Sequence, residues 1–117
     1  MNKINTKALK ESLTINDYKK ILAVLDIPIF LETKDYIIYF SGDKNIDARR
    51  GSPKLYFYKD TRIFIGYSAS RSYDIISLTQ TRLSLLKQPC SFIDAINYIL
   101  NVTGIESSQV QRVANPN

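Results

Sequence analysis

The apolar residues of this chain recur first with the period of a helix. After Thr14, apolar side chains follow at helical spacing as far as Leu25, and Asp17 stands three positions beyond Thr14. A hydroxyl residue followed three positions later by an acidic one is the pattern of a capping box, which marks a helix start. Pro28 ends this predicted helix.

Two further helices are predicted in the C-terminal half. Apolar residues between Asp74 and about Leu86 predict one helix, which Asp74 is expected to cap. Another begins behind Ser91, because Asp94 stands where a capping box needs it, and ends at Gly104.

Between the helical patterns, shorter runs have the composition of strands. Residues 35–41, 54–58 and 62–67 are rich in aromatic and β-branched side chains. Residues 59–61 separate the last two runs by a hairpin-length connection, whereas the polar and basic residues 42–51 read as a loop. The sequence therefore predicts an α+β fold with a small antiparallel sheet flanked by about three helices.

Alternation along one strand predicts which side chains face the solvent. Leu55 and Phe57 fall on one face, and Lys54, Tyr56 and Tyr58 on the other. We expect the apolar pair to face the core, which leaves the two tyrosines on the surface beside the lysine.

The basic residues gather around the same strands. Residues 44–71 hold seven basic and two acidic residues, so their balance of +5 equals the net charge of the whole chain. Cations interleaved with aromatic rings are typical of surfaces that bind single-stranded nucleic acid, where cations follow phosphates and rings stack on bases. We predict that Arg62 and Phe64 extend this surface from the neighbouring strand. The predicted nucleic-acid-binding residues are Arg49, Arg50, Lys54, Tyr56, Tyr58, Lys59, Arg62, Phe64, Tyr67 and Arg71.

A structural interpretation of these residues stays open. Aromatic residues are favoured in strands for packing alone, and lysine and arginine commonly solvate surfaces. The clustering of the charge favours the nucleic-acid interpretation for the patch as a whole.

The composition argues against catalysis and against a metal centre. The chain has one cysteine, Cys90, and no histidine, so it lacks a disulfide and a Cys/His zinc set. Its acidic residues form no recognisable catalytic pair, and Cys90 has no histidine to activate it. We predict a non-enzymatic protein of one small domain, without a cofactor, spanning residues 12–104 between an extension, 1–11, and a tail, 105–117.

Between Ser52 and Leu78 the chain reads SPKLYFYKDTRIFIGYSASRSYDIISL. This segment resembles, without a gap, the second half of the zinc-binding domain at the N-terminus of bacterial replicative (DnaG-type) primases, the CHC2 zinc-finger family. The family's Thr-Pro-Ser-Phe step appears as Ser52-Pro53-Lys54-Leu55, and its Cys-Phe-Gly-Cys knuckle falls on Gly66-Tyr67-Ser68-Ala69. The family's Gly-Asp-x-Ile-x-Phe motif, which starts a helix, corresponds to residues 73–78. Its closing helix, with the motif Phe-x-Glu-Ala-x-x-x-Leu, corresponds to residues 92–99. The first Cys-Pro-x-His pair should lie near residues 40–43.

The resemblance implies a zinc-ribbon-like fold that has lost its zinc, since Gly66 and Ala69 occupy the two cysteine positions of the knuckle. A structural zinc supplies folding free energy, so its loss requires a substitute. The predicted substitute is a hydrophobic cluster around the former knuckle. Its members are Ile63, Phe64, Ile65 and Tyr67.

In the family, the zinc domain helps to engage single-stranded template while a separate domain performs polymerisation. The resemblance therefore implies an accessory protein that binds single-stranded DNA, or RNA, and a polymerase, primase or helicase encoded separately. The alternatives are a protein-docking module without nucleic-acid contact, or an inhibitor that mimics a primase domain. The sequence has neither a membrane-spanning apolar stretch nor the apolar core of a signal peptide, so we expect a cytoplasmic protein without membrane contact.

Overall fold

The chain forms an antiparallel sheet in which each strand pairs with its neighbours in sequence. The structure is a computed structural model that describes residues 5–40, 55–67, 71–86 and 90–106. Within these residues the sheet has five strands in the order β1-β2-β3-β4-β5. The strands are β1 (Ile29–Glu32), β2 (Tyr36–Tyr39), β3 (Leu55–Tyr58), β4 (Ile63–Gly66) and β5 (Arg71–Tyr73).

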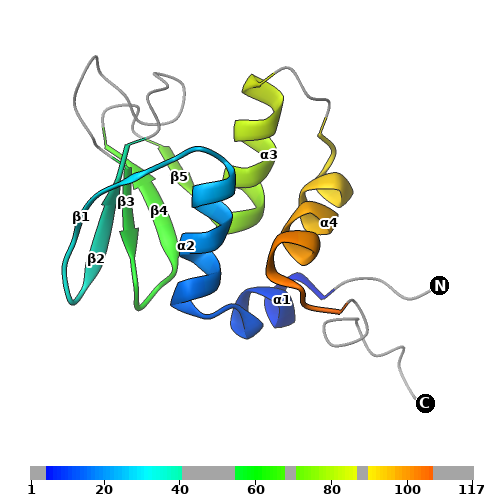
Figure 1. Cartoon of the computed structure of the whole chain (residues 1–117), viewed down its shortest axis with the longest axis horizontal. Helices are drawn as coiled ribbons and strands as arrows, with labels where there is room; N and C mark the ends of the chain where they lie inside the picture. Colours follow the sequence, from blue (N-terminus) through cyan, green and yellow to red (C-terminus); the bar gives the residue numbers. More distant parts are fainter. Residues whose placement is uncertain (1–4, 41–54, 68–70, 87–89, 107–117) are drawn as a thin grey trace.

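The helices of the described residues gather on one side of this sheet (Figure 1). They are α1 (Thr6–Ser12), α2 (Ile15–Val24), α3 (Ile75–Leu85) and α4 (Phe92–Thr103). Helix α4 packs against both α2 and α3. None of these described helices has the length and apolar character that crossing a membrane requires.

The helix boundaries follow the capping signals in the sequence. The Thr14 hydroxyl accepts from the Asp17 N–H at 3.1 Å, and the Asp17 carboxylate accepts from the Thr14 N–H at 2.9 Å. Ser91 and Asp94 make the same reciprocal pair at the start of α4. Gly104 ends α4 with a φ of 75°, a left-handed conformation that glycine adopts without strain. Both predicted capping boxes and the glycine stop are confirmed.

The core lies between the helices and one face of the sheet. Ile37, Phe57, Phe64 and Tyr73 stand side by side across β2 to β5 and are buried. Tyr18 of α2 stacks on Phe57 with ring centroids 4.8 Å apart. This row of side chains joins the sheet to the helices. Residues that alternate with them along the strands lie on the other face of the sheet.

The predicted α+β class and antiparallel sheet are confirmed, but the sequence interpretation missed three elements. Strands β1 and β5 form the sheet edges, and α1 lies largely within the predicted N-terminal extension. Leu9 of α1 is fully buried in the core. The packed unit therefore includes residues before position 12.

Candidate nucleic-acid interface

Four tyrosine rings form one connected cluster on the sheet face opposite the helices. We call this surface the tyrosine face. It consists of Tyr36 from β2, Tyr56 and Tyr58 from β3, and Tyr67 directly after β4. The Tyr56 ring centroid lies 5.4 Å from that of Tyr36, 6.2 Å from that of Tyr58 and 5.0 Å from that of Tyr67. The described helices all lie beyond the opposite face (Figure 1).

Strand alternation explains how the rings reach the same face. Leu55 and Phe57 are fully buried, whereas Tyr56 and Tyr58 are half-buried, which confirms the predicted orientation of β3. Tyr36 stands directly opposite Tyr58 in the antiparallel pair and therefore shares its face. Sequence reasoning missed Tyr36, because β2 reads YIIY and shows no alternation of polar and apolar residues.

A hydrogen bond fixes two of the rings relative to each other. The hydroxyl oxygens of Tyr58 and Tyr67 lie 2.5 Å apart. This bond, together with partial burial, raises the pKa of Tyr58 to about 12. The shift means that the protonated hydroxyl of Tyr58 is stabilised by its neighbour. Tyr58 is therefore uncharged at neutral pH and held against Tyr67.

Replacing Tyr67 with phenylalanine should lower the pKa of Tyr58 toward the ordinary tyrosine value of about 10. The substitution removes the hydrogen bond but keeps the aromatic ring. An NMR titration with carbon-labelled tyrosine, assigned with a Tyr58→Phe variant, measures the shift. A pKa that stays near 12 in Y67F would contradict the bond as its main cause.

Among the described residues, two basic side chains predicted for the surface, Lys59 and Arg62, contact other groups of the protein. Lys59 donates to the Glu32 carboxylate at 2.9 Å and to the Thr33 carbonyl at 2.8 Å. Lys19 pairs with the other oxygen of Glu32 at 2.8 Å. Hydrogen bonds from Lys19 and Lys59 hold the pKa of Glu32 below its usual value. Lys59 therefore lies at the edge of the tyrosine face and shares the single carboxylate of Glu32 with Lys19.

The prediction that Arg62 and Phe64 extend the tyrosine face is wrong. The side chain of Phe64 is fully buried against Phe57, with ring centroids 4.7 Å apart. The Arg62 guanidinium lies over the ring of the core residue Tyr18, 5.7 Å from its centroid, and donates to the Leu13 carbonyl. Both side chains therefore belong to the helix-covered side of the sheet.

Of the remaining residues predicted from the sequence, Arg71 lies within the part of the chain that the structure describes. Arg71 is exposed at the edge strand β5 and pairs with Gly66, which gives it the strand parity of the core residue Tyr73. The tyrosine face therefore does not include Arg71. Arg49, Arg50, Lys54 and Ala69 lie outside the described residues.

The four side chains expected to replace a zinc site do not form the predicted hydrophobic cluster. Of the four, Phe64 is buried in the core, while Ile65 is half-buried and Ile63 and Tyr67 are exposed. Gly66 is buried at the end of β4. Among the described residues, no three histidine, cysteine or acidic side chains come together in a way that would hold a metal ion.

Comparison with known proteins adds no relative. No family model matches the chain, and neither a curated protein nor a solved structure matches it significantly. The resemblance to primase zinc-binding domains therefore rests on the residues of the chain itself.

Proposed function

We propose that this protein binds single-stranded DNA on the tyrosine face and serves as a non-catalytic accessory of a replication enzyme. The observation that carries the proposal is the cluster of four contacting tyrosine rings on the sheet face away from the described helices. Stacking of a base on an aromatic side chain contributes about 1–3 kcal/mol and accepts any base. A strand laid across the sheet would offer its bases to these rings.

Among the described residues, the end of the tyrosine face carries two lysines and two aspartates, so only Lys34 and Lys59 offer contacts to the phosphates of such a strand. A hollow of about 500 Å³ opens at the turn-side end of β2 and β3. Its lining residues are Lys34, Asp35, Tyr36, Tyr58, Lys59 and Asp60. Phosphates would compete with Glu32 for Lys59, so the rings are expected to contribute more affinity than this lysine. Arg49, Arg50 and Lys54 are predicted phosphate contacts from the sequence alone.

The replication role rests on the resemblance to primase zinc-binding domains. Such a domain contacts template while another polypeptide segment performs the chemistry, so the proposal includes a separately encoded polymerase, primase or helicase. Single-stranded RNA is the alternative ligand, because stacking does not distinguish the two sugars.

Docking of a protein is the second candidate, and the apolar side chains of the tyrosine face favour it. The half-buried Ile65 stands directly opposite Tyr56, and the exposed Ile63 stands opposite Tyr58. Interface cores are enriched in tyrosine and depleted in charge. The paired state of Lys59 fits this candidate as well.

Titration of fluorescently labelled single-stranded and duplex DNA at several salt concentrations separates the two candidates. We expect tighter binding to single strands, with a logarithmic salt slope of roughly −0.7 for each phosphate neutralised. Reversing the charges of Arg49, Arg50 and Lys54 should reduce that slope by about 2 in a folded protein.

Three results of this titration would contradict the proposal or part of it. Absence of binding at low salt would favour a docking module. A preference for duplex DNA would place the interaction on a surface other than the tyrosine rings, because paired bases do not expose their faces. Equal affinity of the charge-reversed variant would remove those three residues from the site.

A further inference from the structure

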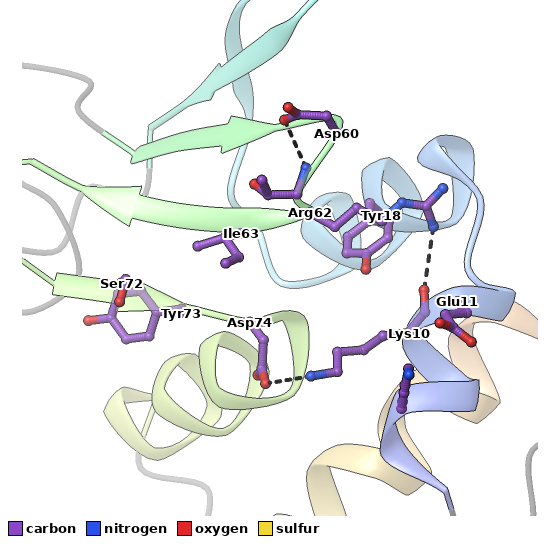
Figure 2. Close-up of a pocket in the computed structure, with 11 residues that line it drawn as sticks. Lys10, Glu11, Tyr18, Asp60, Arg62, Ile63, Ser72, Tyr73 and Asp74 are labelled. Atoms are coloured by element: carbon purple, nitrogen blue, oxygen red, sulfur yellow. Dashed lines mark hydrogen bonds and ion pairs between the residues drawn. The ribbon is translucent and has the colours of Figure 1, made fainter.

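A second hollow lies beside β4 and β5, between the sheet and α1. It has a volume of about 580 Å³ and opens between α1, the β3–β4 turn, β5 and the start of α3. Figure 2 shows Tyr18, Lys10 and Asp74 directed toward the gap between these elements. The Asp60 carboxylate instead points back to its own turn, where it accepts from the Thr61 N–H at 2.8 Å. Hollows of this size are typical of small-molecule sites.

The floor of this pocket carries a buried hydroxyl without a partner. The side chain of Tyr18 is fully buried, and its hydroxyl makes no hydrogen bond within the described part of the chain. Figure 2 shows the hydroxyl directed into the gap framed by Arg62, Lys10 and Asp74. Burial raises the pKa of Tyr18, and the neighbouring Arg62 guanidinium partly offsets that rise. A buried hydroxyl that lacks a partner destabilises the fold, so a ligand atom that pairs with it gains affinity.

The walls of the pocket carry both signs of charge. Lys7 and Glu11 are one turn apart on α1 and both line the hollow. Across from them, the β3–β4 turn contributes Asp60 and Arg62. A ligand of one charge would be attracted by half of these groups and repelled by the other half.

The remaining charged pair closes one end of the hollow and is satisfied. Lys10 and Asp74 form an ion pair at 3.2 Å. Asp74 also accepts from the Ser77 N–H at 2.7 Å, which confirms its predicted role as the cap of α3. This pair therefore leaves Lys7, Glu11 and the turn to select the charge of a ligand.

The backbone of Arg62 supports a built site. Its φ of 60° lies in the left-handed region, which non-glycine residues adopt rarely and at a cost. That conformation accompanies the contacts of its guanidinium with Tyr18 and with the carbonyls of Lys10 and Leu13. The arginine is thus fixed at the wall of the pocket, beside the floor hydroxyl.

We propose that this pocket binds a small zwitterion that carries an ammonium and a carboxylate, such as a free amino acid or a dipeptide. The carboxylate lies toward Lys7, Arg62 and the Tyr18 hydroxyl, and the ammonium lies toward Glu11 and Asp60. Ile63, which is 41% exposed and lines the hollow, offers an apolar surface to the side chain of the ligand. None of the four rings of the tyrosine face lines this pocket, so the proposal does not depend on nucleic-acid binding.

The test measures binding of the twenty free amino acids and a set of dipeptides to the full chain. Saturation-transfer NMR detects the compounds that bind, and calorimetry then measures their affinities. We expect at least one compound to bind, and its N-acetylated and amidated forms to bind at least about 10-fold more weakly, since each loses a charge–charge contact. The free amino acids and the dipeptides are separate arms, so the size of the ligand is determined in the same experiment.

Two buried tyrosines give a matched pair of variants. Tyr18→Phe should weaken binding about 10-fold without loss of folding, because it removes an unpaired hydroxyl and keeps the ring. Tyr39→Phe removes the other buried hydroxyl that lacks a partner in the described residues, away from the pocket lining, and should leave affinity unchanged. Absence of binding across both arms, equal binding of the charge-blocked forms, or equal effects of the two variants would overturn the proposal.

Discussion

Replacing Arg82 with methionine should lower the free energy of unfolding by about 2–4 kcal/mol, because a buried charged donor is lost from two backbone acceptors. Arg82 of α3 is only 8% exposed. Its Nε donates to the Leu25 carbonyl at 3.0 Å and its Nη2 donates to the Asp26 carbonyl at 3.3 Å. These carbonyls lie at the C-terminal end of α2, where the helix dipole favours a cation.

The loss in R82M would leave the carbonyl groups at the end of α2 without their charged partner, and methionine offers no donor to replace it. Urea denaturation measures the change. The matched control is Arg71→Met, the same substitution at an exposed position, for which we expect a change within about 0.5 kcal/mol. Equal stability of the two variants would show that the contacts of Arg82 contribute nothing net. Arg82→Lys should fall between them, since lysine keeps the charge but not the two-pronged donor geometry.

Local sequence signals predicted the parts of the fold that local chemistry determines. The capping boxes at Thr14 and Ser91 and the left-handed Gly104 each depend on residues within one turn, so the sequence contains all of the information. The alternation of Leu55 and Phe57 with two tyrosines likewise determined the orientation of β3.

The missed elements depend on contacts between distant residues. Helix α1 has only seven residues and is marginal by itself. It is held by Arg62, which donates to carbonyls at its C-terminal end, and by the ion pair of Lys10 with Asp74. Strand β1 shows no alternation, because all four of its residues are exposed at a sheet edge that contains a register shift.

The prediction of the binding surface was wrong at β4, because this strand is apolar on both faces. In β4, Ile63 and Ile65 alternate with Phe64 and Gly66, so hydrophobicity alone did not determine which set faces the core. The register determines it, because Phe64 stands between the buried Phe57 and Tyr73. Arg62, directly before β4, does not lie on the expected surface, because its left-handed backbone directs its side chain toward α1.

Replacing both Tyr56 and Tyr58 with alanine should weaken binding of single-stranded DNA by about 30-fold or more. The estimate takes about 1 kcal/mol as the smallest contribution of each stacked base and assumes that two bases lose their platform. Tyr56 contacts all three other rings of the tyrosine face, so its loss also removes the support that orients them. Fluorescence anisotropy with a labelled oligonucleotide measures the affinity.

Two control variants distinguish stacking from other causes of a loss. The double variant Tyr56→Phe with Tyr58→Phe keeps both rings and removes both hydroxyls, so stacking predicts affinity within a few-fold of the original. Phe92→Ala removes an aromatic ring that is 48% exposed at the start of α4, on the helix side of the molecule, and should not affect binding. A loss of affinity in the phenylalanine variant equal to that in the alanine variant would mean that hydroxyl groups, and not ring faces, contact the strand. Unchanged affinity in a folded alanine variant would exclude the tyrosine face as the binding surface and leave protein docking as its function.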